Sequence, residues 1–491
     1  MKSILFLKSF LITMLFLTVF FLIAGCGNKE DESKMQITTS SEEARAEFLK
    51  GRELFEKLRG QESRIHFENA IAKDNNFAMA YYYHSLSSPS AKEFFADLEK
   101  MTSLVDNVTE GEKLFILALK SGNEGNQKKQ EEQLKKLVEL YPNDERAQNQ
   151  IGQFYFGLQK YQLAVDHLQK ATEINPDFSL AYNMLGYSYR NLGDYVNAEK
   201  AFLKYIDIIP DDPNPYDSYA ELLMKEGKYE ASIGQYKKAL SVNSKFVNSF
   251  VGIATNYGFL KKYQSARTEC DKLYKIARNN GEKRFALFTK VVSYVSEGKT
   301  DSALTEMQKQ YAIAEALNDA GNMTADLNTM GNILFEAGKY DKAKEKYDSA
   351  LQTAVNSNLP DKVKENNQRF YLYNVARISL MKGNVDDAKS TAKEFSEKSM
   401  AANNTFQVWL SHELNGLIAL NQKDYKKARD EFMQANQQNP YTFYRIALTY
   451  DGENNKTEAK KYYDKSVEFN ALNNLNQAFV MNKVKNMPEI M

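Results

Sequence analysis

The sequence predicts an all-α fold built from similar pairs of helices stacked along the chain. Three observations lead to this prediction. One pattern of small and large residues returns at intervals of 34 residues, its spacing is that of amphipathic helices, and only nine of the 491 residues are proline. A single helix pair cannot bury its apolar faces alone, so neighbouring pairs must stack into a solenoid.

The first 25 residues have the features of a secretory signal peptide, which takes no part in the fold. Two lysines are their only charges, and residues 10–23 are almost wholly apolar. This run is too short to span a bilayer as a helix, which takes about 20 residues. Its end, IAGC at residues 23–26, resembles the lipobox of bacterial lipoproteins. The resemblance implies cleavage before Cys26 and lipidation of the Cys26 thiol. An ordinary signal peptide with an incidental cysteine is the alternative.

We expect residues 26–43 to form the lipidated N-terminus and a flexible tether, because they are polar and lack any regular period. The lipid would anchor the protein in the bacterial cell envelope, in the outer membrane. The stretch KEDE at 29–32 resembles the tag that exports some lipoproteins to the cell surface. A solvated tether has the same composition, so a periplasmic and a surface location both stay open.

Residues 181–210 carry the clearest copy of the repeat, AYNMLGYSYRNLGDYVNAEKAFLKYIDIIP. This copy closely resembles the tetratricopeptide pattern. Its signature residues are Tyr182, Leu185, Gly186, Tyr189, Ala198, Phe202 and Pro210. Tyr205 departs from the pattern, which usually has alanine there. The resemblance implies a right-handed superhelix. In it Gly186 and Ala198 are small because the two helices of a pair touch, and large residues such as Phe202 fill the space between pairs.

The same pattern divides the rest of the chain. Five regular units occupy residues 111–280, divergent units precede them at 44–110, and units of variable length follow at 281–473. We expect about twelve helix pairs, and a last helix at 474–491 that covers the open end, because terminal units need a cap.

Cys270 has no partner for a disulfide if Cys26 carries lipid, since the chain has only two cysteines. It occupies the repeat position held by Phe202 and Tyr236 in the two preceding units, which faces neighbouring helices. We therefore expect a small buried hydrophobe rather than a reactive thiol.

Composition and motifs argue against nucleic-acid binding, catalysis and metal binding. The chain has 64 basic and 64 acidic residues, and loss of the two signal lysines leaves a net charge of −2, which gives no general attraction to nucleic acid. The sequence HELNG at His412 lacks the second histidine of a zinc-binding H-E-x-x-H motif, and no phosphate-binding glycine motif occurs. We expect no catalytic residue, no metal and no cofactor.

The family resemblance also implies a binding face. In tetratricopeptide arrays the first helices line the concave side, and unit positions 5, 9 and 12 point into it, a spacing that keeps them on one helix face. We predict that a protein or peptide partner contacts eleven residues. They are Asn149, Gln153, Phe156, Asn183, Tyr187, Arg190, Asp217, Glu221, Met224, Asn248 and Thr255. Ordinary solvated residues are the alternative.

The sequence therefore predicts a membrane-anchored scaffold or adaptor that holds a partner in a cell-envelope complex and is not an enzyme. A surface lipoprotein that binds a nutrient, either a glycan or a peptide, is the second interpretation. Sugar-binding platforms usually rely on exposed tryptophan, and Trp409 is the only one in the chain. An enzyme is the third, and the missing catalytic set counts against it.

Overall fold

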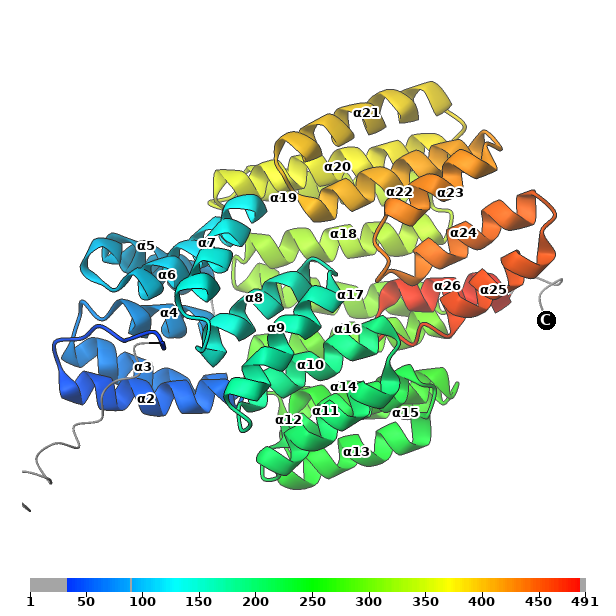
Figure 1. The fold of residues 1–491 in the computed structure, drawn as a ribbon. Helices are drawn as coiled ribbons and strands as arrows, with labels where there is room; N and C mark the ends of the chain where they lie inside the picture. The colour runs from blue at the N-terminus through cyan, green and yellow to red at the C-terminus, as the bar shows by residue number, and fades with distance from the viewer. Residues whose placement is uncertain (1–32, 89–90, 486–491) are drawn as a thin grey trace, which may run out of the picture. The chain divides into compact units, whose positions relative to one another are not determined.

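The computed structural model describes residues 33–88 and 91–485, and every regular element in these ranges is a helix. Twelve helix pairs, α2/α3 to α24/α25, are followed by a single helix, α26, in the described part of the chain (Figure 1). The predicted all-α solenoid is confirmed. The predicted signal peptide and Cys26 lie outside the described residues.

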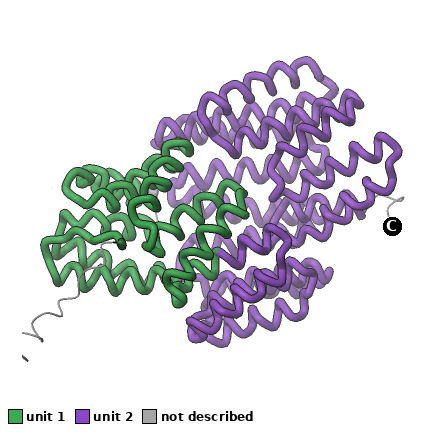
Figure 2. The backbone as a smooth tube through the Cα atoms, viewed as in Figure 1, with its two compact units in different colours: residues 1–184 green, residues 185–491 purple. Residues whose placement is uncertain are grey.

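The helices divide into two compact units, residues 1–184 and 185–491 (Figure 2). Unit 1 contains α2 (Glu42–Glu56), α3 (Gly60–Lys73), α4 (Ala78–Leu86), α5 (Ala91–Ser103), the short 3-10 helix η1 (Val105–Asn107), α6 (Glu110–Asn123), α7 (Gln127–Leu140), α8 (Glu145–Gly157) and α9 (Tyr161–Ile174). The next helix, α10 (Ser179–Leu192), begins in unit 1 and continues into unit 2.

Unit 2 continues with the remaining helix pairs and α26. These helices are α11 (Tyr195–Ile208), α12 (Pro213–Lys225), α13 (Tyr229–Val242), α14 (Val247–Phe259), α15 (Tyr263–Ile276), α16 (Asn280–Ser296), α17 (Thr300–Ala316), α18 (Ala320–Glu336), α19 (Tyr340–Val355), α20 (Asp361–Met381), α21 (Val385–Ala401), α22 (Thr405–Asn421), α23 (Tyr425–Gln434), α24 (Pro440–Gly452), α25 (Lys456–Val467) and α26 (Leu475–Lys485). From α16 to α22 the helices are longer, which accounts for the wider spacing of the later units.

The turn inside a helix pair depends on one residue with a left-handed backbone. Between α10 and α11 this residue is Gly193, with φ +80°. Its N–H donates to the Arg190 carbonyl at 3.1 Å, and the Asp194 N–H donates to the Tyr189 carbonyl at 3.0 Å, so the last carbonyls of α10 are paired. Asp194 then accepts from the Asn197 N–H and caps α11. Glycine adopts this conformation without a steric penalty.

Close packing inside a pair depends on a glycine in the first helix and a large residue sixteen positions later. A Cβ atom at Gly186 would lie 2.6 Å from Phe202 Cε1, and one at Gly416 would lie 2.5 Å from Phe432 Cε1. Both rings are fully buried. The prediction that Gly186 lies where two helices approach closely is confirmed.

Cys270 lies in the core of unit 2. Only 2 % of its surface is exposed, and it packs in a cluster with Ala254, Ala266 and Tyr257. Burial raises the pKa of its thiol to about 12. The predicted role as a small buried hydrophobe is confirmed.

The expectation of a flexible tether up to residue 43 is wrong for residues 34–41. These residues, which we call the strap, lie without regular secondary structure against unit 1, and α2 begins directly after them. Met35 is buried, and its side chain fills the space that the missing side chain of Gly111 leaves.

The strap crosses the beginnings of three successive first helices. The Ser40 N–H donates to Asp74 before α4 at 2.9 Å, and the Thr38 N–H donates to Glu112 of α6 at 2.8 Å. The Met35 N–H donates to Asp144, the cap of α8, at 3.0 Å. Hydrogen bonds from backbone N–H groups to carboxylates are strong. These three bonds therefore hold the strap on unit 1.

The C-terminal helix α26 packs on α24 and α25, and also on α16. Figure 1 shows α26 beside α16 and α25. It therefore covers the last helix pair, as a cap would, and in addition contacts a pair much earlier in unit 2. Residues 486–491 of the predicted cap lie outside the described part of the chain.

Candidate partner-binding face

Several neighbouring first helices adjoin one another in unit 2. α12 contacts α14, α14 contacts α16, and α20 contacts α22, whereas no two second helices have a comparable contact among the described residues. In a curved stack, the helices on the inner side are closer together than those on the outer side. Since the first helices contact one another and the described second helices have no comparable contact, the first helices line the inner side. We call this side the inner face.

Several predicted residues of the inner face bond to each other across neighbouring pairs. Arg190 on α10 forms an ion pair with Glu221 on α12, with 3.0 Å between Nη1 and Oε2, and its guanidinium lies 4.6 Å from the centre of the Tyr187 ring. The Tyr187 hydroxyl is 3.2 Å from the Ser218 hydroxyl. These side chains link two first helices, so part of their binding capacity is already used inside the chain.

Asp217 continues this polar row toward the next pair. Its carboxylate accepts a hydrogen bond of 2.8 Å from the Ser249 hydroxyl on α14. Burial, together with the nearby Glu221 carboxylate, raises the pKa of Asp217 well above its ordinary value. A buried carboxyl with a raised pKa binds a proton more readily, and so adds less negative charge to the inner face than the sequence suggests.

The prediction that all eleven residues face an open groove needs correction. Asn149, Asn183, Asp217 and Met224 are buried by the chain itself, with exposed fractions between 1 and 6 %. The first helices approach each other closely enough to cover these positions. Six others are half-buried and one is exposed. The half-buried residues are Gln153, Phe156, Tyr187, Arg190, Glu221 and Thr255, and the exposed residue is Asn248.

Comparison with known families identifies the repeat. Family models described as tetratricopeptide repeat match residues 145–178, 167–200 and 440–471. The chain contains tetratricopeptide repeats. The matched ranges include α8 and α9 of unit 1 and α24 and α25 of unit 2.

Two solved structures show partial similarity. MamA MSR-1 C2 is 21% identical over 34% of this chain and 97% of its own, with a TM-score of 0.27. A tetratricopeptide repeat protein from Parabacteroides merdae ATCC 43184 is 17% identical over 55% of this chain and 98% of its own, with a TM-score of 0.35. No curated protein matches the chain at a significant level.

The inner face of unit 2 is occupied by the chain's own C-terminal segment at α12, α14 and α16. Residues 469–474 connect α25 to α26 and contact three first helices. Lys225 at the end of α12 donates from Nζ to the Phe469 carbonyl, and its ammonium lies 3.5 Å from the centre of the Phe469 ring. The side chain of Asn473 donates to Thr289 Oγ1 on α16 at 3.1 Å.

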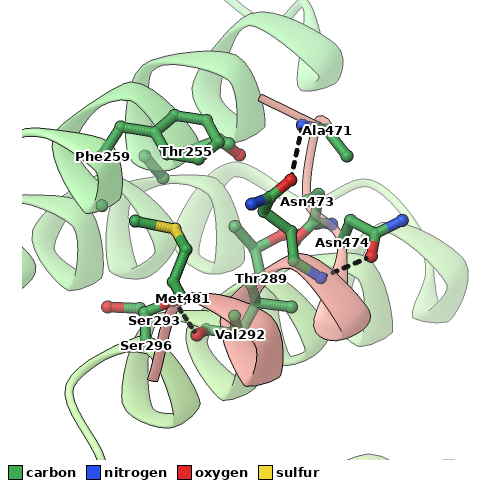
Figure 3. Close-up of a pocket in the computed structure, with 14 residues that line it drawn as sticks. Thr255, Phe259, Thr289, Val292, Ser293, Ser296, Ala471, Asn473, Asn474 and Met481 are labelled. Carbon is green, nitrogen blue, oxygen red and sulfur yellow. Dashed lines mark hydrogen bonds between the residues drawn. The ribbon is translucent and has the colours of Figure 1, made fainter. Parts of the chain in front are cut away.

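A pocket lies between this segment and two first helices, α14 and α16 (Figure 3). Thr255 and Phe259 of α14 and Thr289, Ser293 and Ser296 of α16 form one wall. Residues 471–481 form the other, and no charged side chain lines the pocket. Thr255 was predicted to contact a partner. In the structure it faces the C-terminal segment, and its hydroxyl donates to the Val251 carbonyl at 2.8 Å.

A buried network of charges connects four first helices, α18, α20, α22 and α24, and sequence analysis missed it. Arg445 on α24 pairs with Glu413 on α22, with 2.8 Å between Nη1 and Oε2, and Tyr373 on α20 donates to the same carboxylate. Burial by itself would raise the pKa of Glu413, but Arg445 and Tyr373 hold it below its ordinary value. The sequence signal that could have indicated this network was the presence of charged residues among apolar neighbours in the predicted first helices.

The same network reaches α26. Glu336 at the end of α18 accepts a hydrogen bond of 2.5 Å from the Tyr441 hydroxyl and forms an ion pair with Lys483 at 3.0 Å. Arg377 of α20 lies 3.7 Å from the other carboxylate oxygen. These contacts fix the C-terminal helix to the inner face of unit 2 by charge as well as by apolar packing.

No group of three or more His, Cys, Asp or Glu side chains in the described ranges could hold a metal ion. Within the same ranges, no helix has the length and apolar character needed to cross a membrane.

Proposed function

We propose that this chain is a lipid-anchored scaffold of the bacterial cell envelope, which binds a protein or peptide partner through the inner face of its tetratricopeptide repeats. The observation that carries the proposal is the row of polar and aromatic side chains that links the first helices α10, α12 and α14. Tetratricopeptide arrays generally act as scaffolds, so we propose no enzymatic activity. This last step is an analogy at the level of the fold.

Partner binding is tested by capture from an envelope fraction with the full-length protein. In unit 1, Gln153 and Phe156 of α8 are half-buried on the first helix. The double change Gln153→Ala and Phe156→Ala should remove the partner that the wild type retains, while the helix content stays the same. Lys170→Ala and Glu173→Ala make a matched control, because both side chains are exposed on α9, the second helix of the same pair. Equal capture by both variants would place the interface elsewhere.

The proposed anchor is tested separately. Cys26→Ser removes the thiol of the lipobox-like sequence and should give an unlipidated precursor that mass spectrometry identifies by its retained signal peptide. A wild-type mature chain that begins elsewhere and carries no lipid would contradict the anchor. Protease treatment of intact cells then separates a surface location from a periplasmic one, since only a surface-exposed chain is cut.

A further inference from the structure

Residues 469–474 lie against the inner face of unit 2, which we call their closed position. Three features of the segment and of Lys225, which it contacts, lower the stability of this position. The first is the backbone. Asn470 and Asn473 have φ of 50° and 45°. This left-handed region disfavours residues other than glycine, although asparagine tolerates it better than most.

The second feature is an ammonium group without a carboxylate partner. Lys225 Nζ contacts the carbonyl and the ring of Phe469, and no carboxylate of the described residues lies within ion-pair distance of it. The charged groups that act on it, Arg190 on α10 and Lys465 on α25, are both positive. Burial and these two charges lower the pKa of Lys225 to about 7. A carbonyl oxygen compensates a buried positive charge less well than a carboxylate does.

The third feature is incomplete hydrogen bonding. The side-chain oxygen of Asn473 is buried and has no partner. It lines the pocket of Figure 3, whose wall on this side is the C-terminal segment itself. An unpaired buried acceptor destabilises the closed arrangement.

Hydrogen bonds and apolar contacts of the segment oppose these costs. Asn470 accepts from the Tyr229 hydroxyl at 2.8 Å and donates to the Lys225 carbonyl at 3.3 Å. Phe469 and Leu472 each pack against an apolar cluster of unit 2. The helix that follows, α26, has separate apolar contacts with Val291 and Val295 of α16. Movement of residues 469–474 away from Lys225 therefore withdraws Phe469 and Leu472 from their clusters, while α26 keeps its own apolar contacts.

We infer that residues 469–474 form a latch over the inner face of unit 2, and that an acidic segment of a protein partner opens it by bringing a carboxylate to Lys225. The inference rests on the proposed function and names the chemistry of the partner. A carboxylate in place of the Phe469 carbonyl pairs the ammonium, and the displaced latch is relieved of its two left-handed asparagines. Opening also uncovers the hydroxyl-lined wall of α14 and α16, including Thr255, for the rest of the segment.

The first experiment tests whether the latch opens. Asn470→Ala in the full-length protein removes two hydrogen bonds and makes the left-handed backbone costlier. Chymotrypsin should then cut after Phe469 about tenfold faster than in the wild type. Asn454→Ala is the matched control, because Asn454 has φ of 60° in the exposed turn between α24 and α25, away from the latch. Cleavage at Phe469 that is unchanged by Asn470→Ala would overturn the latch.

The second experiment tests the acidic partner with two labelled peptides of residues 466–485. One carries Asn470→Glu and the other Asn470→Gln, so they differ only in charge. The Glu peptide should bind the Asn470→Ala protein about tenfold more tightly than the Gln peptide, and added salt should reduce the difference. Lys225→Met should abolish the difference. Lys228→Met should preserve it, because Lys228 is exposed and already pairs with Glu226.

Two outcomes would overturn the inference: neither peptide binds the Asn470→Ala protein, or the Glu peptide keeps its advantage in Lys225→Met. Neither outcome affects the proposed function, which depends on capture of an envelope partner by the wild-type chain. Conversely, the peptides could bind as expected while the wild-type chain captures no envelope partner. That result would contradict the proposed function and would still support the latch.

Discussion

Replacing Gly186 by alanine tests how tightly the two helices of a pair are packed. The added Cβ atom would lie 2.6, 2.7 and 2.8 Å from three atoms of the Phe202 ring. Carbon atoms in favourable contact are about 3.5–4.0 Å apart. The ring cannot move aside easily, because Phe202 is fully buried. Gly186→Ala therefore forces the two helices apart.

The magnitude follows from two opposing terms. Overpacking a core contact costs about 1–3 kcal/mol, while alanine in a helix is favoured over glycine by about 1 kcal/mol. We expect a net loss of about 1 kcal/mol in the free energy of unfolding, which lowers the melting temperature by about 2–4 °C. Circular dichroism of the purified mature protein measures this shift.

Gly234→Ala is the matched control, since Gly234 lies inside α13 and a Cβ atom there would meet no atom within 4 Å. It should stabilise the protein by about 1 kcal/mol through helix propensity alone. Adding Phe202→Leu to Gly186→Ala should recover part of the loss, because the smaller side chain leaves room for the methyl group. If Gly186→Ala stabilises as much as Gly234→Ala does, the close approach of α10 and α11 is refuted.

Three further predictions concern titratable groups. Cys270 should react with a thiol reagent only after unfolding, since it is buried and the pKa of its thiol is raised to about 12; rapid labelling of the native protein would contradict this. Glu413→Gln leaves Arg445 buried without its charged partner and should lower the free energy of unfolding by about 3 kcal/mol, measured by urea denaturation; no change would mean that the pair contributes nothing. Lys225 has a pKa of about 7 in the folded protein against 10.5 ordinarily, so the unfolded chain binds more protons between these values and stability should rise with pH across this window; Lys225→Met should remove that part of the pH dependence, and an unchanged profile would show that Lys225 is solvated.

The sequence predicted the features that are determined within one repeat. The approach of Gly186 to Phe202 and the burial of Cys270 depend on residues at fixed distances along the chain, so the 34-residue pattern indicates them. These features follow from helical periodicity and backbone conformation alone.

Contacts between distant repeats could not be predicted in this way. Met35 meets Asp144, and Lys225 meets Phe469, only because many small rotations between pairs add up to a particular curvature. The 34-residue period of the sequence does not determine the total rotation between distant pairs. The covering of the inner face by residues 469–484, and the burial of Asp217 and Met224, are consequences of the same curvature.

The strap has a mechanical consequence for unit 1. A stack of repeats that is pulled at its first helix unravels one pair at a time, because each pair contacts only its neighbours. Here a pull on the N-terminus reaches Lys34 and Met35 first, and these residues are held on α8, three pairs beyond α2. The load is therefore carried in turn by α8, α6 and the beginning of α4 before it arrives at α2. Tension applied at the N-terminal end must therefore break the contacts of the strap with all three first helices before the first helix pair can unfold.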